Sequence, residues 1–345
     1  MKKAAFFRMG FFAVALVVLL GTMTPAIAAG DGKLKEGALF KLTVLQTNDL
    51  HGQIDSIIDW PDYGIYHENS IAKFSTIIKQ VRAEQENVLL LEGGDIFLRG
   101  PLQVFHGEVE NAILKAIGYD AMVLGNNDFR VYPAGSGTPE SRYTQLKDYH
   151  RDQNFPLLCA NVIVKETGKL IQNVKDFKNF SFDGVKIAVV GITSMKPEVR
   201  NWPDVADLDF LDPVETLEGV LSSMKQKSDI NLVLSHAGNW TPDFLDHELA
   251  KVDGVAAVIG ADSHKIIDPP EFEMRDGQVV PITQAGGEPF TFLGRLDMTF
   301  QVIDGQMQLI EYSGRLYNVT YMDVEPDPEI TKIIDYYEAL LEEME

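Results

Sequence analysis

The chain has 345 residues, of which 51 are acidic and 30 are Lys or Arg, so its formal net charge at pH 7 is −21. A surface this acidic repels nucleic acids and anionic membranes, which argues against both as partners, whereas bound cations would still allow a small phosphate-bearing substrate. The length suits one large domain or two modest ones. The lone cysteine, Cys159, excludes an internal disulfide and is expected to be a buried core residue.

The N-terminus has the pattern of a cleavable export signal, residues 1–28. A basic start over residues 2–8 precedes an apolar run over residues 11–20, and Ala26 and Ala28 are typical of a cleavage site. The apolar run is shorter than the ~20 residues that a membrane-spanning helix needs. This favours cleavage after Ala28 over an uncleaved anchor, and predicts a periplasmic or secreted protein without a stable membrane span.

Apolar strand-like runs alternate with amphipathic stretches along most of the chain, which predicts a layered α/β fold. The strand-like runs lie near residues 40–46, 87–92, 120–124, 156–161, 186–192, 230–235, 255–259 and 279–284. The stretches with helical spacing of apolar residues are 71–82, 109–117 and 213–227.

The last part of the chain predicts a β-hairpin and a terminal helix. Alternating segments at 290–302 and 306–316 flank Asp304-Gly305, a turn sequence typical of hairpins. Residues 326–345 have apolar side chains at helical spacing, which predicts a helix that covers the core or, alternatively, forms a dimer contact. No Pro-, Gly- or Ser-rich linker precedes this helix, so we predict one domain over residues 35–325; the oligomeric state is not predicted.

Five of the strand-like runs end in a glycine-flanked residue of a metal-ligand type. In the first, Thr47-Asn48-Asp49-Leu50-His51-Gly52, an Asp and a His two residues apart can turn toward one point. Ligands in α/β proteins gather outside the carboxyl ends of strands, so five such junctions favour a shared site over ordinary turns. Together the junctions offer Asp49, His51, Asp95, Asn126, His236, Asp262 and His264.

This set of side chains also restricts the kind of metal. Carboxylate, amide oxygen and imidazole ligands suit Mn²⁺, Fe²⁺, Mg²⁺ or Zn²⁺. No thiolate is involved, which excludes a structural zinc knot. Seven ligands exceed the need of one ion and fit two divalent ions that share a carboxylate.

The motifs also carry a family resemblance. In order they read Thr-Asn-Asp-Leu-His-Gly, Gly-Gly-Asp, Gly-Asn-x-x-Phe, Ser-His-x-Gly and Gly-x-x-Ser-His. This order resembles the calcineurin-like metallophosphoesterases, and within them the N-terminal catalytic domain of the 5′-nucleotidase and UDP-sugar hydrolase group. The resemblance implies a four-layer α/β/β/α sandwich with a dinuclear metal site. It also implies hydrolysis of phosphate mono- or diesters, nucleotides among them, by a metal-bridging hydroxide, and hence nucleotide catabolism.

The resemblance further implies how the ligands divide between the ions. Asp95 would bridge the two. Asp49, His51 and His264 would hold one ion, and Asn126, His236 and Asp262 the other. Asp262 stands where the group usually has His, and His264 where it often has Gln. Both remain competent ligands, and the additional carboxylate favours harder metals.

Two departures from the family pattern concern catalysis. The group usually reads Gly-Asn-His-Glu-Phe-Asp, in which the later Asp orients a His that stabilises the transition state and can protonate the leaving group. Here Asn127 replaces that His and Arg130 replaces the Asp. Asn127 can donate a hydrogen bond but cannot act as an acid, and losing a general acid typically costs ~10²–10⁴ in rate.

Three residues are therefore candidates for substrate chemistry. Asn127 and Arg130 are candidate catalytic residues, and Arg99 is a candidate substrate-binding cation, although a surface salt bridge is the alternative for each arginine. Trp240, four residues after His236, could flank a substrate or simply pack.

Two other functions are kept as alternatives. The first, suggested by Asn127 and Arg130, is a catalytically impaired protein that binds metal or phosphate esters. The second is a sulfur-oxidation-type thiohydrolase that resembles the same group. In the family a second domain grips the nucleoside. The chain ends before such a domain, so a nucleoside-binding C-terminal domain is expected to be absent.

Overall fold

The computed structural model describes residues 35–97, 99–130, 156–193, 196, 200–224, 228–240 and 244–344. The expected signal peptide lies outside the described residues. Within the described part of the chain, no helix combines the length and the hydrophobicity that a membrane span requires.

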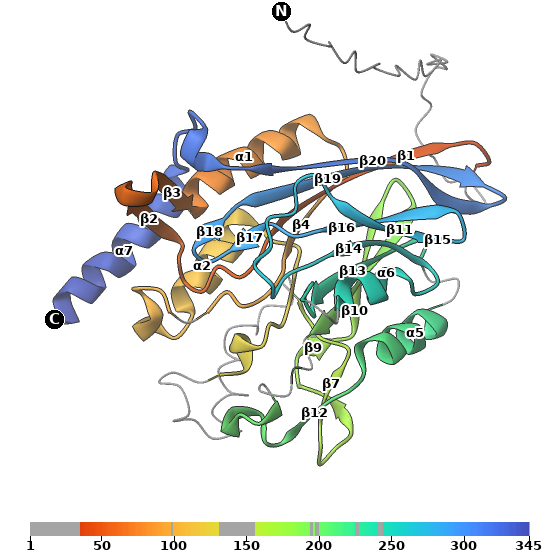
Figure 1. The fold of residues 1–345 in the computed structure, drawn as a ribbon, viewed down its shortest axis with the longest axis horizontal. Coiled ribbons are helices and arrows are strands. Elements are labelled where there is room, and N and C mark those ends of the chain that lie inside the picture. Colours follow the sequence, from red (N-terminus) through yellow and green to blue (C-terminus); the bar gives the residue numbers. More distant parts are fainter. Residues whose placement is uncertain are drawn as a thin grey trace, which may run out of the picture.

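Two mixed β-sheets form the centre of the fold (Figure 1). The seven-stranded sheet has the order β20 (Gln306–Tyr317), β19 (Leu293–Ile303), β1 (Leu39–Thr47), β4 (Val88–Glu92), β5 (Ala121–Val123), β6 (Leu157–Leu158), β9 (Val174–Lys175). The six-stranded sheet has the order β10 (Phe177–Phe182), β11 (Val185–Thr193), β13 (Ile230–His236), β14 (Val255–Ile259), β16 (Gln278–Thr283), β15 (Glu271–Arg275). In each sheet the central strands run parallel, from β1 to β6 and from β11 to β16.

The helices and three small sheets surround this centre. The α-helices of the described residues are α1 (Ile71–Glu84), α2 (Glu108–Ile117), α5 (Pro213–Ser223), α6 (Leu245–Ala250) and α7 (Pro328–Met344). The small sheets pair β2 (Asp55–Trp60) with β3 (Ile65–Ser70), β17 (Gly286–Gly287) with β18 (Phe290–Thr291), and β7 (Val162–Val164) with β8 (Lys169–Leu170) and β12 (Leu208–Phe210).

The two large sheets pack face to face and are covered by helices on both outer faces. Leu89 and Leu91 of β4 belong to the core between the sheets, whereas Leu90 packs toward α1, α2 and α7. On the other sheet, Leu232 faces the shared core and Val233 packs toward α5 and α6. Strands buried on both faces read as continuous apolar runs. The fold is thus the predicted four-layer α/β/β/α sandwich (Figure 1).

The predicted hairpin and terminal helix are confirmed. Ile303 pairs with Gln306, and the two turn residues Asp304 and Gly305 have φ of 53° and 74°. Positive φ at both positions is what a type I′ hairpin turn requires. Helix α7 buries Ile330 and Ile334 against the core that includes α1 and α2, so it covers the core as expected.

The sequence did not predict the β2–β3 hairpin. Its first strand, Asp55–Trp60, is largely exposed, and Ile57 has 64% of its surface accessible. No residue of this strand is fully buried, and Ile57 and Ile58 are adjacent, so the sequence lacks the alternation of apolar and polar residues that indicates a strand. Helix α5 also ends at Ser223, before the expected end of the helical pattern.

Glu110 in the first turn of α2 is expected to make stability depend on pH. Its side chain is buried, and its Oε2 has no hydrogen-bond partner among the described residues. Burial raises the pKa of Glu110 from its usual 4.5 to about 7. The folded protein therefore keeps a proton that the unfolded chain releases, so this group's stabilising contribution is full below pH 4.5 and is lost as the pH rises through 7.

Replacing Glu110 with Gln is therefore expected to raise the free energy of unfolding at pH 8 by up to about 3 kcal/mol relative to the wild type. At pH 4.5 the two proteins are expected to differ little. Urea unfolding of both proteins at the two pH values measures this difference. An equal difference at both values would contradict the assignment to Glu110.

Candidate metal centre

The loops at the carboxyl ends of the parallel strands meet at one edge of the fold. Asp49 and His51 follow β1, Asp95 follows β4, and Asn126 follows β5. His236 is the last residue of β13, and the loop after β14 contributes the last two, Asp262 and His264. Parallel strands end on the same side of a sheet, and the two sheets are stacked, so both supply side chains to one place.

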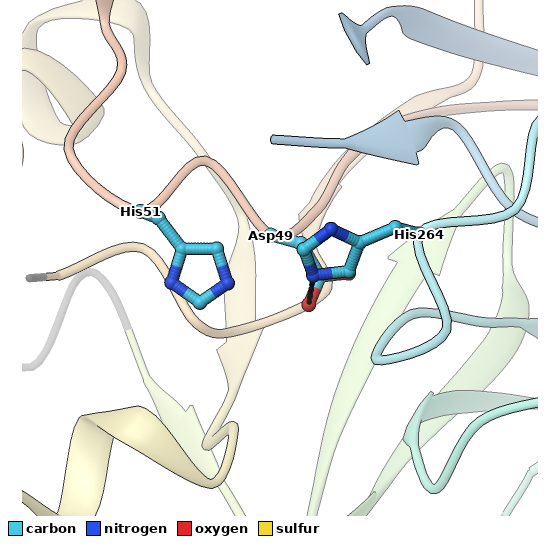
Figure 2. A group of neighbouring side chains, drawn as sticks. All are labelled: Asp49, His51 and His264. Carbon is cyan, nitrogen blue, oxygen red and sulfur yellow. Dashed lines mark ion pairs between the residues drawn. The ribbon is translucent and has the colours of Figure 1, made fainter. Parts of the chain in front are cut away.

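The first group of side chains consists of Asp49, His51 and His264. Figure 2 shows the His264 imidazole against the Asp49 carboxylate, with the His51 imidazole to one side; Asp49 and His51 share one loop, whereas His264 comes from a loop far away in the sequence. His264 Nε2 lies 3.4 Å from Asp49 Oδ1, and the two imidazole centroids are 5.3 Å apart. One possible ligand atom from each residue lies within 4.8 Å of the others, so these three residues could hold a metal ion.

The second group consists of Asp49, Asp95 and His236, whose possible ligand atoms also lie within 4.8 Å of one another. His236 Nε2 is 3.4 Å from Asp95 Oδ2 and 3.9 Å from Asp49 Oδ1. Asp95 Oδ2 is also 3.8 Å from His51 Nε2. This oxygen therefore lies between imidazoles that the family resemblance assigns to different ions.

Asp262 and Asn126 complete the cluster. Asp262 Oδ1 lies 3.6 Å from His236 Nε2. With its amide nitrogen turned toward Asp262, Asn126 lies 3.0 Å from that same oxygen. The structure thus brings all seven predicted residues together, and their division between two ions stays a prediction.

Four buried atoms at the centre of this cluster have no hydrogen-bond partner within the described part of the chain. They are Asp49 Oδ1, His236 Nε2 and both ring nitrogens of His51. An unsatisfied buried polar atom costs ~1–3 kcal/mol. Carboxylate oxygens and imidazole nitrogens that converge without a donor between them suit a cation, so the residues fit a divalent metal ion.

The backbone at the cluster is strained in the way that functional sites often are. Five of the seven residues adopt a left-handed conformation: Asp49 (φ 52°), His51 (48°), Asp95 (56°), Asp262 (70°) and His264 (52°). Such a conformation costs of order 1–3 kcal/mol when the residue is not glycine, although Asp and His tolerate it better than most. Its repetition within one cluster indicates that the loops are shaped to aim these side chains.

Hydrogen bonds orient the ligand candidates. His236 Nδ1 lies 2.7 Å from the carbonyl oxygen of Gly93, and His264 Nδ1 lies 2.7 Å from that of Glu288. A ring nitrogen that donates to a backbone carbonyl leaves Nε2 as the nitrogen that can bind a metal. Asp128, which the sequence analysis did not single out, accepts from the Asp95 backbone N–H at 2.9 Å and so fixes the loop.

The carboxylates give the centre a strongly negative potential. Burial lowers the pKa of His236, but the charges of Asp95 and Asp49 outweigh burial and raise this pKa well above its usual value. In His51 burial dominates, and its pKa is lowered. A potential that favours a proton on His236 favours a metal cation at the same place.

Gly125 leaves room for two of the ligand candidates. A Cβ at this position would clash with Asp95 Oδ1 and would lie 2.7 Å from His236 Cε1. Gly125→Ala is therefore expected to displace both side chains and to weaken Mn²⁺ binding ~10–100-fold in calorimetric titrations. The control is Gly219→Ala in α5, where a Cβ meets nothing within 4 Å and should leave binding unchanged. Equal affinities in the two variants would contradict this role of Gly125.

The residues expected to act on the substrate have other contacts. Asn127 donates from its backbone N–H to Asp95 Oδ1 and from Nδ2 to Asp95 Oδ2, both at 2.6 Å. Arg130 Nη1 is 3.4 Å from Asn127 Oδ1, and its guanidinium lies 4.4 Å from the Trp202 ring centroid. Arg99 forms an ion pair with Glu288 at 3.0 Å, which is the salt bridge expected as the alternative to substrate binding. The catalytic and substrate-binding roles of these residues stay predictions.

Sequence reasoning missed Lys196. Its Nζ lies 2.8 Å from Oδ1 and 2.6 Å from Oδ2 of Asp262. Trp240 Nε1 donates to Oδ2 of the same carboxylate at 2.6 Å. Lys196 comes three residues after Thr193, the last residue of β11. It is thus a polar residue shortly after a strand end, which is the signal that indicated the ligand candidates.

Comparisons with known proteins agree with this architecture. Residues 42–266 match the family model of the calcineurin-like phosphoesterases. The 5′-nucleotidase of Vibrio cholerae is 34% identical over 209 residues, which cover 58% of this chain and 34% of that protein. The trifunctional nucleotide phosphoesterase protein YfkN of Bacillus subtilis is 27% identical over 343 residues, which cover 90% of this chain and 21% of that protein.

A solved structure shares the fold. The 5′-nucleotidase precursor from Thermus thermophilus matches with a TM-score of 0.74 at 24% identity, covering 88% of this chain and 59% of that one. The chain thus spans about a fifth to a third of the two curated relatives' lengths. The family model covers well over half of the chain. The protein therefore belongs to the calcineurin-like phosphoesterase family and is similar to its 5′-nucleotidases.

Proposed function

We propose that the protein is an exported hydrolase that uses two divalent metal ions to cleave phosphate mono- or diesters, with nucleotides as the first candidates. One observation carries the proposal: seven ligand-type side chains from both sheets converge around buried oxygen and nitrogen atoms without hydrogen-bond partners in the described residues. Residues 35–325 would form the catalytic domain, with the terminal helix as part of its core. The choice of nucleotides is supported by the similarity to a 5′-nucleotidase and to a nucleotide phosphoesterase protein.

The proposed ligand set is Asp49, His51 and His264 for one ion and Asn126, His236 and Asp262 for the other, with Asp95 between them. When bound, such ions polarise a phosphoryl oxygen and lower the pKa of a water so that it can attack in line. The chain's own contribution is to hold the ligands rigid.

Asn127 matters to this proposal in two ways. Its two nitrogens fix both oxygens of Asp95, which keeps the carboxylate in one orientation. As an amide it has no proton to give to a leaving group. Substrates with leaving groups that depart without protonation are therefore expected to react fastest.

The first test is hydrolysis by the purified protein after reconstitution with Mn²⁺, Zn²⁺ or Mg²⁺. The panel contains p-nitrophenyl phosphate, bis(p-nitrophenyl) phosphate, AMP and UDP-glucose. We expect turnover of at least one class, its loss on removal of metal with EDTA, and its recovery with added metal. Two bound ions without turnover of any substrate would favour the alternative function, a phosphate-ester binding protein. Fewer than one tightly held ion per molecule would refute the metal site itself.

Export is proposed from the basic start, the apolar run and the small residues before Ala29. N-terminal sequencing of the protein recovered outside the cytoplasm is expected to begin at Ala29. Recovery of only the intact Met1 form in the cytoplasm would contradict this proposal.

A further inference from the structure

Lys196 places a positive charge against one of the proposed metal ligands. Its Nζ contacts both oxygens of Asp262, at 2.8 and 2.6 Å, and lies 4.5 Å from the Trp240 ring centroid. The Asp262 side chain is only 3% exposed and the Lys196 side chain 27%. The pair is thus more sheltered than an ordinary surface ion pair, whose net contribution is usually small.

The two proposed metal positions differ in how much their ligands are already engaged. Asp49 Oδ1 and both ring nitrogens of His51 at the first position have no hydrogen-bond partner in the described ranges, and the same holds for His236 Nε2 at the second, so the difference lies in Asp262. At the other position, the carboxylate of Asp262 is bonded by Lys196 and by Trp240 Nε1. A divalent ion can bind Asp262 fully only if the ammonium withdraws or tolerates a second cation beside it.

We infer that Lys196 is an internal cation that competes with the second metal ion for Asp262, so that the two ions bind in order and with unequal affinity. This inference rests on the proposed two-metal site. Asp49, His51 and His264 would take up the first ion, because their ion pairs within the described residues are with one another, with Asp95 or with His236. The position of Asn126, His236 and Asp262 would bind the second ion more weakly.

The charge relation at Asp262 supports the inference in a second way. His236 Nε2, the Lys196 ammonium and the Trp240 N–H all face the one carboxylate. Close cations repel, and the repulsion is strongest where burial excludes water. Removing the ammonium therefore removes both a competitor for the carboxylate and a repulsive neighbour of the incoming ion.

The test compares Mn²⁺ binding by wild type and by Lys196→Met, which keeps a side chain of similar length without the charge. Isothermal titration calorimetry gives the affinities, and elemental analysis after dialysis gives the stoichiometry. We expect two classes of site in the wild type. In Lys196→Met the weaker class is expected to tighten about tenfold or more, while the tighter class stays unchanged.

Three further variants isolate the contact. Lys196→Gln is a second neutral variant, and Lys196→Arg keeps the charge and should keep the weaker class weak. Lys265→Met removes an equal charge next to His264, from an ammonium that lies 5.2 Å from the Phe244 ring centroid. This variant should change the Mn²⁺ affinity of the weaker class of site by less than about threefold, because the Lys265 ammonium is not bonded to Asp262 and so couples only weakly to the second ion. Circular dichroism melts verify that each variant folds.

A double-mutant cycle decides whether the effect passes through Asp262. In an Asp262→Asn background, Lys196→Met is expected to change the affinity of the second ion by less than about threefold. If two ions bind and the affinity of the weaker site is the same in the wild type, Lys196→Met and Lys196→Gln, the inference is overturned and the proposed function still stands. A wild type that binds no ion would overturn both.

Discussion

Replacement of Asp95 with alanine is expected to abolish turnover of every phosphate ester and to remove at least one metal ion. Asp95 Oδ2 lies 3.4 Å from His236 Nε2 and 3.8 Å from His51 Nε2, so one oxygen faces both halves of the cluster. Without it the two proposed ions would lose their common ligand. Metal ions supply several kcal/mol of charge stabilisation in such reactions, so we expect kcat to fall about 10³-fold or more.

The measurement is kcat together with the metal content of the same preparation. Asp327→Ala is the matched control, because Asp327 is also a buried carboxylate but bonds Ser75 of α1 and pairs with Lys79. This control is expected to lower the melting temperature while keeping the metal content. Near-normal activity and two ions in Asp95→Ala would refute the role given to this residue.

The second large effect is expected from restoring an acid at the position of Asn127. The double substitution Asn127→His and Arg130→Asp would supply an imidazole and a carboxylate to orient it. For alkyl phosphate monoesters, whose leaving groups need a proton, we expect kcat/KM to rise ~10²-fold. For p-nitrophenyl phosphate the rise should be much smaller, because p-nitrophenolate departs without protonation.

The dependence of kcat/KM on the pKa of the leaving group provides the test. A steep dependence in the wild type should become shallow in the double variant. Asn127→His alone should gain less, because Arg130 leaves its imidazole without a carboxylate, and Arg130→Asp alone should gain nothing. Metal content must be checked in each protein, since Asn127 Nδ2 also holds Asp95. Unchanged slopes at full metal occupancy would show that protonation does not limit the reaction.

Local sequence patterns determined most of the architecture. Leu89, Leu90 and Leu91 form an uninterrupted apolar run because β4 is buried on both faces. The turn at Asp304-Gly305 was predictable because few residue pairs accept positive φ at both positions. The candidate ligands were found for a similar reason, since a polar residue next to glycine after a buried strand indicates a strand end. Each of these features depends on neighbours within a few positions.

Only the tertiary structure decided which side chains meet and at what distance. Lys196 and Asp262 are 66 residues apart, and their contact arises because the ends of β11 and β14 lie in one sheet. The place of Asp95 between His51 and His236 likewise depends on how the two sheets stack. Ligand types can be read from a sequence because they follow strand ends, whereas contacts between loops depend on the packing of elements that the sequence specifies only through the whole fold.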